Sequence, residues 1–362
     1  MHLNEIVVPL VNWYQEHKRQ LPWREQKNPY YIWISEIMLQ QTRVEAVKPY
    51  FDRFIKALPT VADVARCEES RLLKLWEGLG YYNRVRNIQK AAVKIMKEYH
   101  GNFPRDYDSL QKLPGIGEYT AGAVASIAFD VPVPAVDGNV LRVISRIQES
   151  EEDILKPQTK KRIRRELTEI MPVEEPGVFN QALMDLGAMI CLPNGLPKCE
   201  ACPLRKLCLA HLHGRTDEIP VRKKEKKRRI EEKTVLVIQD GDHMALRQRP
   251  EKGLLAGMYE FPNYEGRLCE EEALHVLKDY GLMALRIQPL PEAKHIFSHV
   301  EWRMSGYLIK VAALEGKARK DLVFVDIQNA EEHYPVPAAF GAYASYLHLR
   351  LGQEKYTGGN EG

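Results

Sequence analysis

The stretch from Leu113 to Asp137 constrains the fold most, because a Leu-Pro-Gly-Ile-Gly turn opens a helix of small residues that two prolines then end. Gly115 and Gly117 lack a Cβ atom, so the backbone there can turn sharply and bring its N–H groups close to an anion at a helix N-terminus. Asp137 falls where the next helix begins. The pattern predicts two helices joined by a turn that suits a phosphate, although an ordinary helix-helix turn followed by an N-cap aspartate has the same local sequence.

Hydrophobic periodicity divides the 362 residues into two parts. In the first part apolar residues recur at helical spacing around 6–13, 44–55, 72–76, 88–96 and 179–189, and no β-rich run precedes residue 230. Short β-type segments follow at 234–238, 295–297 and 307–311, with helices near 270–280 and 338–349. We therefore expect an all-α domain over residues 1–213, a basic interdomain linker over 214–233, an α+β domain over 234–352 and a flexible tail over 353–362.

Positive charge is concentrated in the expected linker. The whole chain has a formal net charge of only +3, yet residues 214–233 hold nine Lys and Arg against five acids. A polyanion partner requires such a concentration, although a solvated linker has the same composition. No apolar run reaches the length of a membrane span, and the N-terminus lacks the pattern of a signal peptide. We expect a cytoplasmic protein without a membrane partner, associated with the nucleoid if it is bacterial.

Four of the six cysteines fall within eighteen residues, at positions 191, 199, 202 and 208. In a reducing compartment such clustering indicates a metal site rather than disulfides. Zinc is the general expectation for four thiolates, but the uneven spacing does not repeat a Cys-x2-Cys knuckle, and four cysteines equally suit a 4Fe-4S cluster. Cys67 and Cys269 are isolated, and we expect both to be inert.

Two carboxyl groups stand in contrasting environments. Glu36 lies in a predicted helix, residues 31–42, that is apolar on nearly every side, so burial should raise its pKa. Asp137, at a polar turn beside a helix start, should stay ionised. Cleavage of a glycosidic bond needs such a pair, one to protonate the leaving group and one to support an oxocarbenium-like centre. A buried, hydrogen-bonded structural glutamate would give the same helix pattern.

At this point the turn, Asp137 and the cysteine cluster resemble the helix-hairpin-helix DNA glycosylases with an iron-sulfur cluster. Within that superfamily four motifs are similar to the adenine DNA glycosylases of the MutY type, and the resemblance covers nearly the whole chain. One departure is the first cysteine gap, which has seven residues here and six in many relatives. The four motifs are Leu21-Pro-Trp-Arg24, Ser35-Glu-Ile-Met-Leu-Gln-Gln-Thr42, Gly78-Leu-Gly-Tyr-Tyr82 and Val136-Asp-Gly-Asn-Val140.

The resemblance implies a substrate, a cofactor and a set of residue roles. The substrate would be adenine mispaired with 8-oxoguanine or guanine in duplex DNA, bound by a monomer, and the cofactor a 4Fe-4S cluster. Glu36 would protonate adenine N7, Asp137 would stabilise the sugar cation through a transient covalent bond at C1′, and Tyr119 and Asn139 would position the sugar and water. The cluster ligands would be Cys191, Cys199, Cys202 and Cys208.

Further positions would bind the extruded base and the duplex, since the base must leave the stack to be cleaved. Trp23, Arg24 and Gln181 would line the adenine pocket, and Gln41 and Tyr81 would fill the gap that the base leaves. Viewed alone, Trp23 and Tyr81 also look like ordinary core aromatics. The remaining DNA-contacting positions implied are Thr42, Leu79, Gly115, Gly117, Phe297, Ser298 and His299.

One position separates relatives on the same scaffold. The bifunctional endonuclease III type carries a lysine after its Gly-x-Gly-x step, which forms a Schiff base and cuts the strand. Tyr119 occupies that position here. We therefore predict a monofunctional glycosylase that cuts the strand little by itself.

The second domain resembles a Nudix fold through the run Gly253-Leu-Leu-Ala-Gly-Met-Tyr-Glu-Phe-Pro262. A Nudix hydrolase holds Mg²⁺ with a helix of the form Arg-Glu-x-x-Glu-Glu, and residues 272–279 do not fit that form. We expect the fold without the hydrolase chemistry. In MutY-type enzymes this domain reads 8-oxoguanine, and Phe297-Ser298-His299 matches the family's Phe-Ser-His loop; without the resemblance it reads as a turn between strands.

Alternative functions stay open on the sequence. A mismatch glycosylase for thymine or uracil would use the same scaffold, although Arg24, Gln181 and the second domain argue against it. A non-catalytic DNA-binding protein would need neither Glu36 nor Asp137. The expectation is thus a multidomain protein, an all-α helix-hairpin-helix DNA glycosylase domain with a 4Fe-4S cluster followed by an α+β Nudix-like domain.

Overall fold

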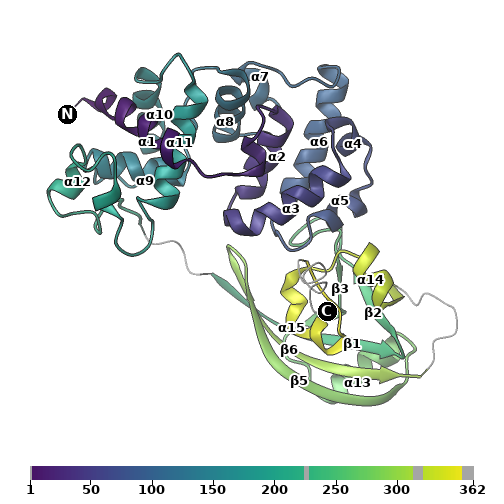
Figure 1. Ribbon diagram of the computed structural model, residues 1–362. Coiled ribbons are helices and arrows are strands. Elements are labelled where there is room, and N and C mark those ends of the chain that lie inside the picture. Colours follow the sequence, from purple (N-terminus) through teal and green to yellow (C-terminus); the bar gives the residue numbers. More distant parts are fainter. Residues whose placement is uncertain (1, 224–227, 313–320, 353–362) are drawn as a thin grey trace, which may run out of the picture. The chain divides into compact units, whose positions relative to one another are not determined.

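The computed structural model describes residues 2–223, 228–312 and 321–352 (Figure 1). The chain forms two compact units, and both are discontinuous in sequence. One unit comprises residues 1–66 and 87–225, and the other comprises residues 67–86 and 226–362. The expected first domain, residues 1–213, therefore contains a twenty-residue segment that packs with the C-terminal fold.

The first unit is helical throughout its described residues, as the periodicity predicts. A continuous core lies between α1, α9, α10 and α11 and includes Leu10, Ile144, Ile163 and Phe179. The elements are η1 (Leu3–Ile6), α1 (Val7–His17), η2 (Pro22–Arg24), α2 (Pro29–Leu39), α3 (Val44–Ala57), α4 (Val61–Arg66), α6 (Asn83–Glu98, which begins in the other unit), α7 (Tyr107–Gln111), α8 (Glu118–Phe129), α9 (Gly138–Ile147), α10 (Pro157–Glu169), α11 (Pro176–Met189), η3 (Cys199–Ala201) and α12 (Leu209–Leu212).

The second unit is built on a seven-stranded mixed sheet with the order β3-β2-β1-β6-β5, where β4 pairs with β1 and β7 with β2. The long strands β1 and β6 run parallel, and the other pairs are antiparallel. The strands are β1 (Arg229–Asp240), β2 (His243–Gln248), β3 (Tyr259–Glu260), β4 (Asn263–Glu265), β5 (Ala284–Ile296), β6 (Val300–Val311) and β7 (Leu322–Asp326).

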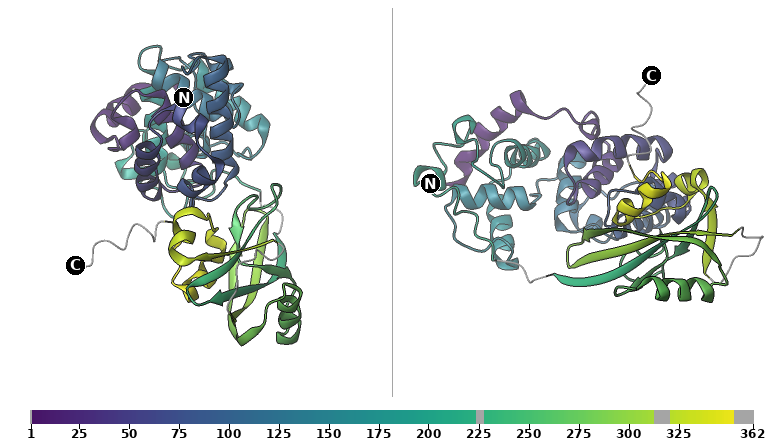
Figure 2. Two further views of the ribbon diagram at one scale, coloured as in Figure 1. Left: turned by 90° about the vertical axis from the view of Figure 1, so that its right-hand side faces the viewer. Right: turned by 90° about the horizontal axis from the view of Figure 1, so that it is seen from below.

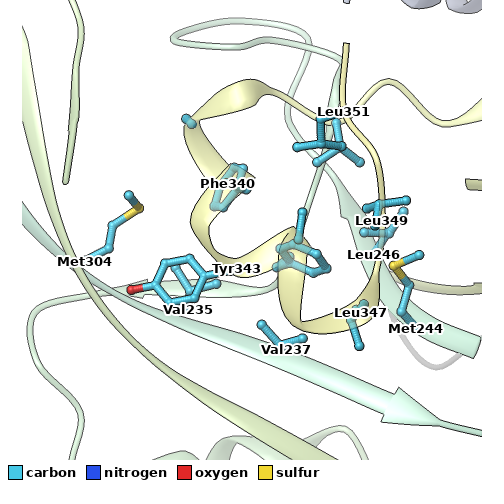
Figure 3. Close-up of a cluster of buried hydrophobic side chains, with 14 of the residues drawn as sticks. Val235, Val237, Met244, Leu246, Met304, Phe340, Tyr343, Leu347, Leu349 and Leu351 are labelled. Atoms are coloured by element: carbon cyan, nitrogen blue, oxygen red, sulfur yellow. The ribbon is translucent and has the colours of Figure 1, made fainter. Parts of the chain in front are cut away.

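Both faces of this sheet carry a hydrophobic core, and successive side chains of β1 point alternately into one core and the other. Val235 and Val237 point into a core with Phe340 and Tyr343 (Figure 3), whereas Leu236 and Ile238 point into a second core on the other face. Figure 2 shows the C-terminal helical turns against one face and α13 against the other. The helices of this unit are α5 (Glu69–Leu75), α13 (Glu270–Asp279), α14 (Ile327–His333), η4 (Ala338–Phe340), α15 (Gly341–Ala344) and η5 (Ser345–Leu347).

Several boundaries differ from the sequence expectation. The predicted linker is structured at both ends: Ile219 is buried, the Ile154 N–H donates to the carbonyl of Val221, and β1 begins at Arg229 rather than at residue 234. The strands β2, β3, β4 and β7 were not predicted, because they are short or lack a clear alternating pattern. Residues 353–362, expected as a tail, lie outside the described residues. Within the described part of the chain, no helix is both long and apolar enough to cross a membrane.

Candidate active site

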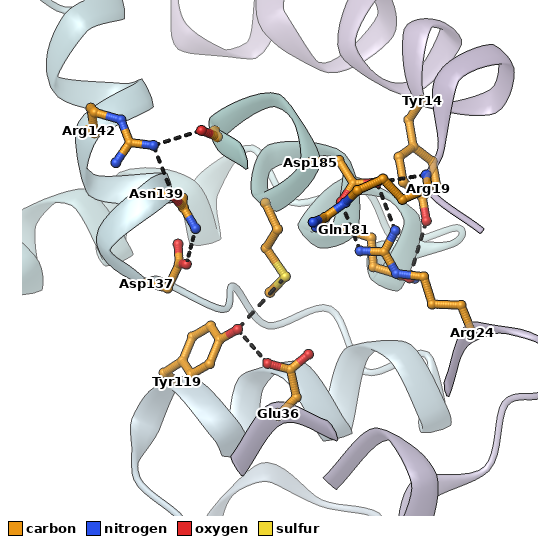
Figure 4. Close-up of polar contacts among 12 residues, drawn as sticks. Tyr14, Arg19, Arg24, Glu36, Tyr119, Asp137, Asn139, Arg142, Gln181 and Asp185 are labelled. Atoms are coloured by element: carbon orange, nitrogen blue, oxygen red, sulfur yellow. Dashed lines mark hydrogen bonds and ion pairs between the residues drawn. The ribbon is translucent and has the colours of Figure 1, made fainter. Parts of the chain in front are cut away.

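Glu36 and Tyr119 form the centre of the site in the first unit. Glu36 comes from α2 and is only 6% exposed, because this helix is apolar on nearly all sides. The Tyr119 hydroxyl, from the first turn of α8, donates to Glu36 Oε2 at 2.5 Å (Figure 4). Burial raises the pKa of Glu36, in the direction expected from its helix, although the hydrogen bond from Tyr119 opposes the shift. Burial also raises the pKa of Tyr119 well above 10, so its hydroxyl keeps its proton.

Asp137 caps the N-terminus of α9, as the sequence predicts. Its Oδ1 accepts the Val140 N–H at 2.8 Å, and its Oδ2 accepts the Asn139 Nδ2–H at 2.7 Å. Both bonds favour the ionised form, but burial outweighs them and raises the pKa of Asp137. That Asp137 stays ionised at neutral pH is still a prediction. The charge of Asp137 also raises the pKa of Glu36, so the two carboxyls lie close enough to interact.

Arg142 holds Asn139, the hydrogen-bond partner of this carboxylate. Its Nη2 donates to Asn139 Oδ1 at 2.9 Å and to the Gly187 carbonyl at 2.7 Å, and its Nε donates to the Cys191 carbonyl at 2.8 Å. A continuous series of hydrogen bonds therefore connects Asp137, Asn139 and Arg142 to the first clustered cysteine. Sequence reasoning missed Arg142, because nothing local distinguishes it from other arginines on an amphipathic helix.

Arg24 is held by a buried acid that the sequence analysis also missed. Asp185 is fully buried. Its carboxylate accepts hydrogen bonds from both terminal nitrogens of Arg24, at 2.7 and 2.9 Å, and from the side chain of Arg19. Burial alone would raise the pKa of Asp185, but the two arginines hold it below its ordinary value. A single aspartate between Met184 and Leu186 on a buried helix was the available signal.

The residues expected to bind adenine line one cavity of about 270 Å³. Trp23, Arg24 and Gln181 all contribute to its wall, and Gln181 accepts the Tyr14 hydroxyl at 3.1 Å. Glu36, Tyr119 and Asp137 are not among its lining residues. Arg24 connects the two sets, since its charge lowers the pKa of Glu36.

The glycine turn joins α7 to α8. Gly115 has a φ of +75°, and a Cβ atom there would lie 2.6 Å from the Cβ of Asn87, so both its conformation and its packing require glycine. Gly117 differs: it is the extended N-cap of α8, and a Cβ atom there would meet no protein atom within 4 Å. Gln41, with a φ of +59°, and Thr42 follow α2 at the surface of the same unit.

Two predicted DNA-binding segments meet in the second unit. Leu79 is buried, whereas Tyr81 is 48% exposed with a φ of +49°. The Tyr81 hydroxyl lies 2.8 Å from Ser298 Oγ, in the turn between β5 and β6. Phe297 packs edge-on against the buried Trp302 at 4.9 Å, and its N–H donates to the Val300 carbonyl, which closes the turn.

The four clustered cysteines are all free thiols. Cys191 Sγ accepts Arg146 Nη1 at 3.2 Å, and Cys208 Sγ donates to the Arg146 carbonyl at 3.4 Å. The pKa of Cys202 is raised to about 12 by burial and by the charges of Cys191, Cys208 and Cys199. Among the described residues, no three side chains of His, Cys, Asp or Glu converge closely enough to hold a single metal ion.

Comparison with known proteins agrees with this architecture. The HhH-GPD superfamily of base excision DNA repair proteins matches residues 34–172, and a NUDIX domain matches residues 234–345. The solved structure of a thermostable thymine-DNA glycosylase superimposes with a TM-score of 0.53 and 30% identity, covering 58% of this chain and 97% of that one. Fold and site together define a helix-hairpin-helix DNA glycosylase of base-excision repair with an added Nudix-like domain.

Full-length relatives identify the family within this class. The adenine DNA glycosylase of Buchnera aphidicola (strain Bp) is 37% identical over 295 residues, which cover 80% of this chain and 82% of the relative. The mouse adenine DNA glycosylase is 35% identical over 81% of this chain and 68% of the relative. The chain belongs to the adenine DNA glycosylase family, which confirms the resemblance and the fold class predicted from the sequence.

Proposed function

We propose that this glycosylase releases adenine mispaired with 8-oxoguanine or guanine in duplex DNA. The observation that carries the proposal is the 2.5 Å hydrogen bond from Tyr119 to the buried Glu36, with Asp137 close enough to influence the same carboxyl group. Two carboxyl groups at one site are what cleavage of an N-glycosidic bond needs.

Each residue has a role that its environment supports. Glu36, whose raised pKa favours the protonated form, delivers a proton to adenine N7 and so makes the base a better leaving group. Asp137 then stabilises the positive charge at C1′, and Asn139 fixes the orientation of its carboxylate. Tyr119 keeps Glu36 pointed into the site and cannot form a Schiff base, so the enzyme is monofunctional.

The duplex binds at the glycine turn and at two loops. The open space around Gly117 lets the N–H groups at the start of α8 approach a phosphate oxygen. Gln41 and Tyr81 fill the gap that the extruded adenine leaves, and Tyr81 stacks there as an aromatic wedge. Thr42 and Leu79 belong to the same two DNA-binding segments. One copy of the chain on one duplex suffices for this arrangement.

The second unit identifies the base opposite adenine. Ser298 lies at the tip of a tight turn, where its hydroxyl can exchange hydrogen bonds with the N7–H and O8 edge that distinguishes 8-oxoguanine from guanine. Phe297 and His299 flank it. The helix α13 lacks the acidic pattern that holds Mg²⁺ in Nudix hydrolases, so we expect no hydrolysis of nucleotides.

A 4Fe-4S cluster fits the cysteine residues of the first unit. Cys191, Cys199, Cys202 and Cys208 supply four thiols whose charges interact, without a histidine or carboxylate among them, which is the donor set of such a cluster. When bound, the cluster would hold the loop of residues 191–208 in place.

Single-turnover adenine release from duplexes with A opposite 8-oxoguanine, G or T, beside a T·G mismatch, tests the proposal. Fast release opposite 8-oxoguanine and G alone is expected. Thymine release from T·G would favour the thymine alternative that the structural neighbour suggests. An Asp137→Asn variant should bind the A·8-oxoguanine duplex and release no base. A separate test is borohydride trapping of the wild type on DNA, since trapping at high yield would contradict the monofunctional assignment.

A further inference from the structure

A buried ion pair anchors the segment 67–86 to the C-terminal fold. Lys74 Nζ donates to the backbone carbonyls of Ala330, at 3.0 Å, and Tyr334, at 2.7 Å, and lies 3.3 Å from Glu77 Oε2. Glu77 Oε1 in turn accepts the Val336 N–H at 2.9 Å. The two side chains are only 11% and 1% exposed. We call Lys74, Glu77 and their backbone partners in residues 330–336 the clasp.

The clasp is joined directly to the loop of residues 78–82. Trp76, fully buried between the two clasp residues, donates its indole N–H to the Gly80 carbonyl at 3.1 Å. Arg84 lies over the Trp76 ring at 5.3 Å and the Tyr81 ring at 5.5 Å, and donates to the carbonyls of Leu79 and Gly80. The positive φ of Tyr81 is therefore enforced by contacts on both sides of the loop.

The loop of residues 78–82 also contacts the turn of residues 297–299 between β5 and β6. The Tyr81 hydroxyl lies 2.8 Å from Ser298 Oγ. Tyr81 therefore keeps its position relative to Ser298 only while residues 67–86 remain packed on the C-terminal fold. Buried charged pairs contribute little net stability, but breaking one leaves an uncompensated charge, so they specify one geometry strongly. The clasp acts on Tyr81 through the backbone of residues 77–81.

We propose that Lys74 and Glu77 are positioning residues for discrimination of the base opposite adenine, because they fix the 78–82 loop to the fold that carries Ser298. This inference rests on the proposed function, in which Tyr81 and Ser298 contact the duplex. Release chemistry itself belongs to Glu36 and Asp137 and needs no clasp.

Two clasp variants and one control test the inference in the full-length enzyme. Glu77→Ala removes the acceptor of the Val336 N–H and the carboxylate beside the Lys74 ammonium, which keeps its bonds to the Ala330 and Tyr334 carbonyls. Glu77→Gln keeps an acceptor for Val336 and removes only the charge. Glu69→Gln is the control, since Glu69 pairs with Arg86 in the same segment but is mostly exposed. Single-turnover release opposite 8-oxoguanine and G is measured for each, with hydrogen exchange of residues 78–82 and 297–299.

For Glu77→Ala we expect the ratio of the two rates to fall about tenfold, mainly through the 8-oxoguanine duplex, with faster exchange in both segments. Glu77→Gln should lie between it and the wild type, and Glu69→Gln should match the wild type. An unchanged rate ratio in a folded Glu77→Ala enzyme overturns the inference. If the wild type itself releases no adenine, the proposed function has failed instead. The hydrogen-exchange data then test the clasp alone, and wild-type protection of residues 78–82 and 297–299 in Glu77→Ala would show that the clasp does not hold these segments.

Discussion

The phenol of Tyr119 and the carboxyl of Glu36, 83 residues apart in sequence, share a 2.5 Å hydrogen bond in which Tyr119 is the donor. A donor to the carboxylate stabilises the ionised form, so this bond lowers the pKa of Glu36 against the larger effect of burial. The pair thus sets how much of the acid form is present at neutral pH.

Removing that donor should shift the pH profile. In Tyr119→Phe the pKa of Glu36 should rise further, because burial is no longer opposed by the hydrogen bond. Since the acid must be protonated to act, the rate falls as pH rises through this pKa, and the descending limb should move to higher pH in the variant. Single-turnover rates across the pH range would reveal the shift, and a limb displaced to lower pH would contradict the assigned donor.

Glu36→Gln should be more stable than the wild type and inactive. Between the ordinary pKa of a glutamate and the raised value in the folded state, the folded protein binds more protons than the unfolded chain, so wild-type stability falls as pH rises through this window. The glutamine carries no charge, so it should melt higher at neutral pH, by roughly 2–4 °C per kcal/mol recovered. The gain should disappear near the ordinary glutamate pKa, and adenine release should fall at least about 100-fold. Thermal melts of both proteins at several pH values measure this difference. A lower melting temperature of Glu36→Gln than of the wild type at neutral pH would contradict the claim that the buried Glu36 carboxylate destabilises the fold.

Arg142→Met should disturb both Asp137 and the cysteine loop. The change removes donors to Asn139 and to the Gly187 and Cys191 carbonyls, and each buried group left unpaired costs about 1–3 kcal/mol. We expect slower adenine release together with a lower melting temperature. Arg205→Met, which breaks an exposed pair with Glu200 inside the cysteine loop, should change neither. Equal effects of the two substitutions would dismiss the special role of Arg142.

Asp185→Asn should loosen the wall of the cavity that Trp23, Arg24 and Gln181 line. It removes the buried negative charge that Arg19 and Arg24 share and leaves them one acceptor oxygen in place of two, which costs about 3–5 kcal/mol. Because the pKa of Asp185 is depressed in the folded state, its contribution is present above the ordinary aspartate pKa and is lost as pH falls through the depressed value. Urea unfolding should therefore show a loss at neutral pH that shrinks in acid. Asp130→Asn, whose pair with Lys27 is exposed at the same cavity, serves as the control.

A Ser298→Ala, His299→Ala double variant should keep adenine excision and lose the preference for 8-oxoguanine over guanine. The catalytic residues are in the other unit, so the chemistry should be spared, while the hydrogen bonds to the lesion edge disappear. Rates on the two duplexes measure this directly. Glu301→Gln, in the adjoining strand β6, should retain the wild-type ratio; a double variant that also retains it would remove the role of the turn.

The fold was predictable where the pattern is long and local. Apolar periodicity located α1, α3, α6 and α11, and short runs of β-branched and other apolar residues located the middle of β1 and the end of β6. The four short strands carry too few residues to establish a period. The assignment of residues 67–86 to the second unit could not be foreseen, because it depends on contacts between residues more than 250 positions apart, such as Lys74 with Tyr334.

The candidate site divides in the same way. Glu36, Tyr119 and Asp137 stand in motifs whose order along the chain marks them. Asp185 and Arg142 acquire their importance from partners on other elements, so their own neighbourhoods do not identify them. The pKa of Asp137 shows the limit of a local rule: its helix-start hydrogen bonds were foreseen, but the surrounding burial that outweighs them was not.

The discontinuity of the first unit also bears on how the chain is made. Segment 67–86 is synthesised early, yet Lys74 and Glu77 acquire their backbone partners only when residues 330–336 have emerged from the ribosome. Until then Lys74 and Glu77 lack these backbone partners, whereas domains otherwise fold as units from the N-terminus. Maturation of this enzyme therefore needs residues 330–336 to bind a segment that was translated long before. A nascent chain halted at residue 225 contains the residues of the helical unit together with a segment, 67–86, whose own unit has not yet been made.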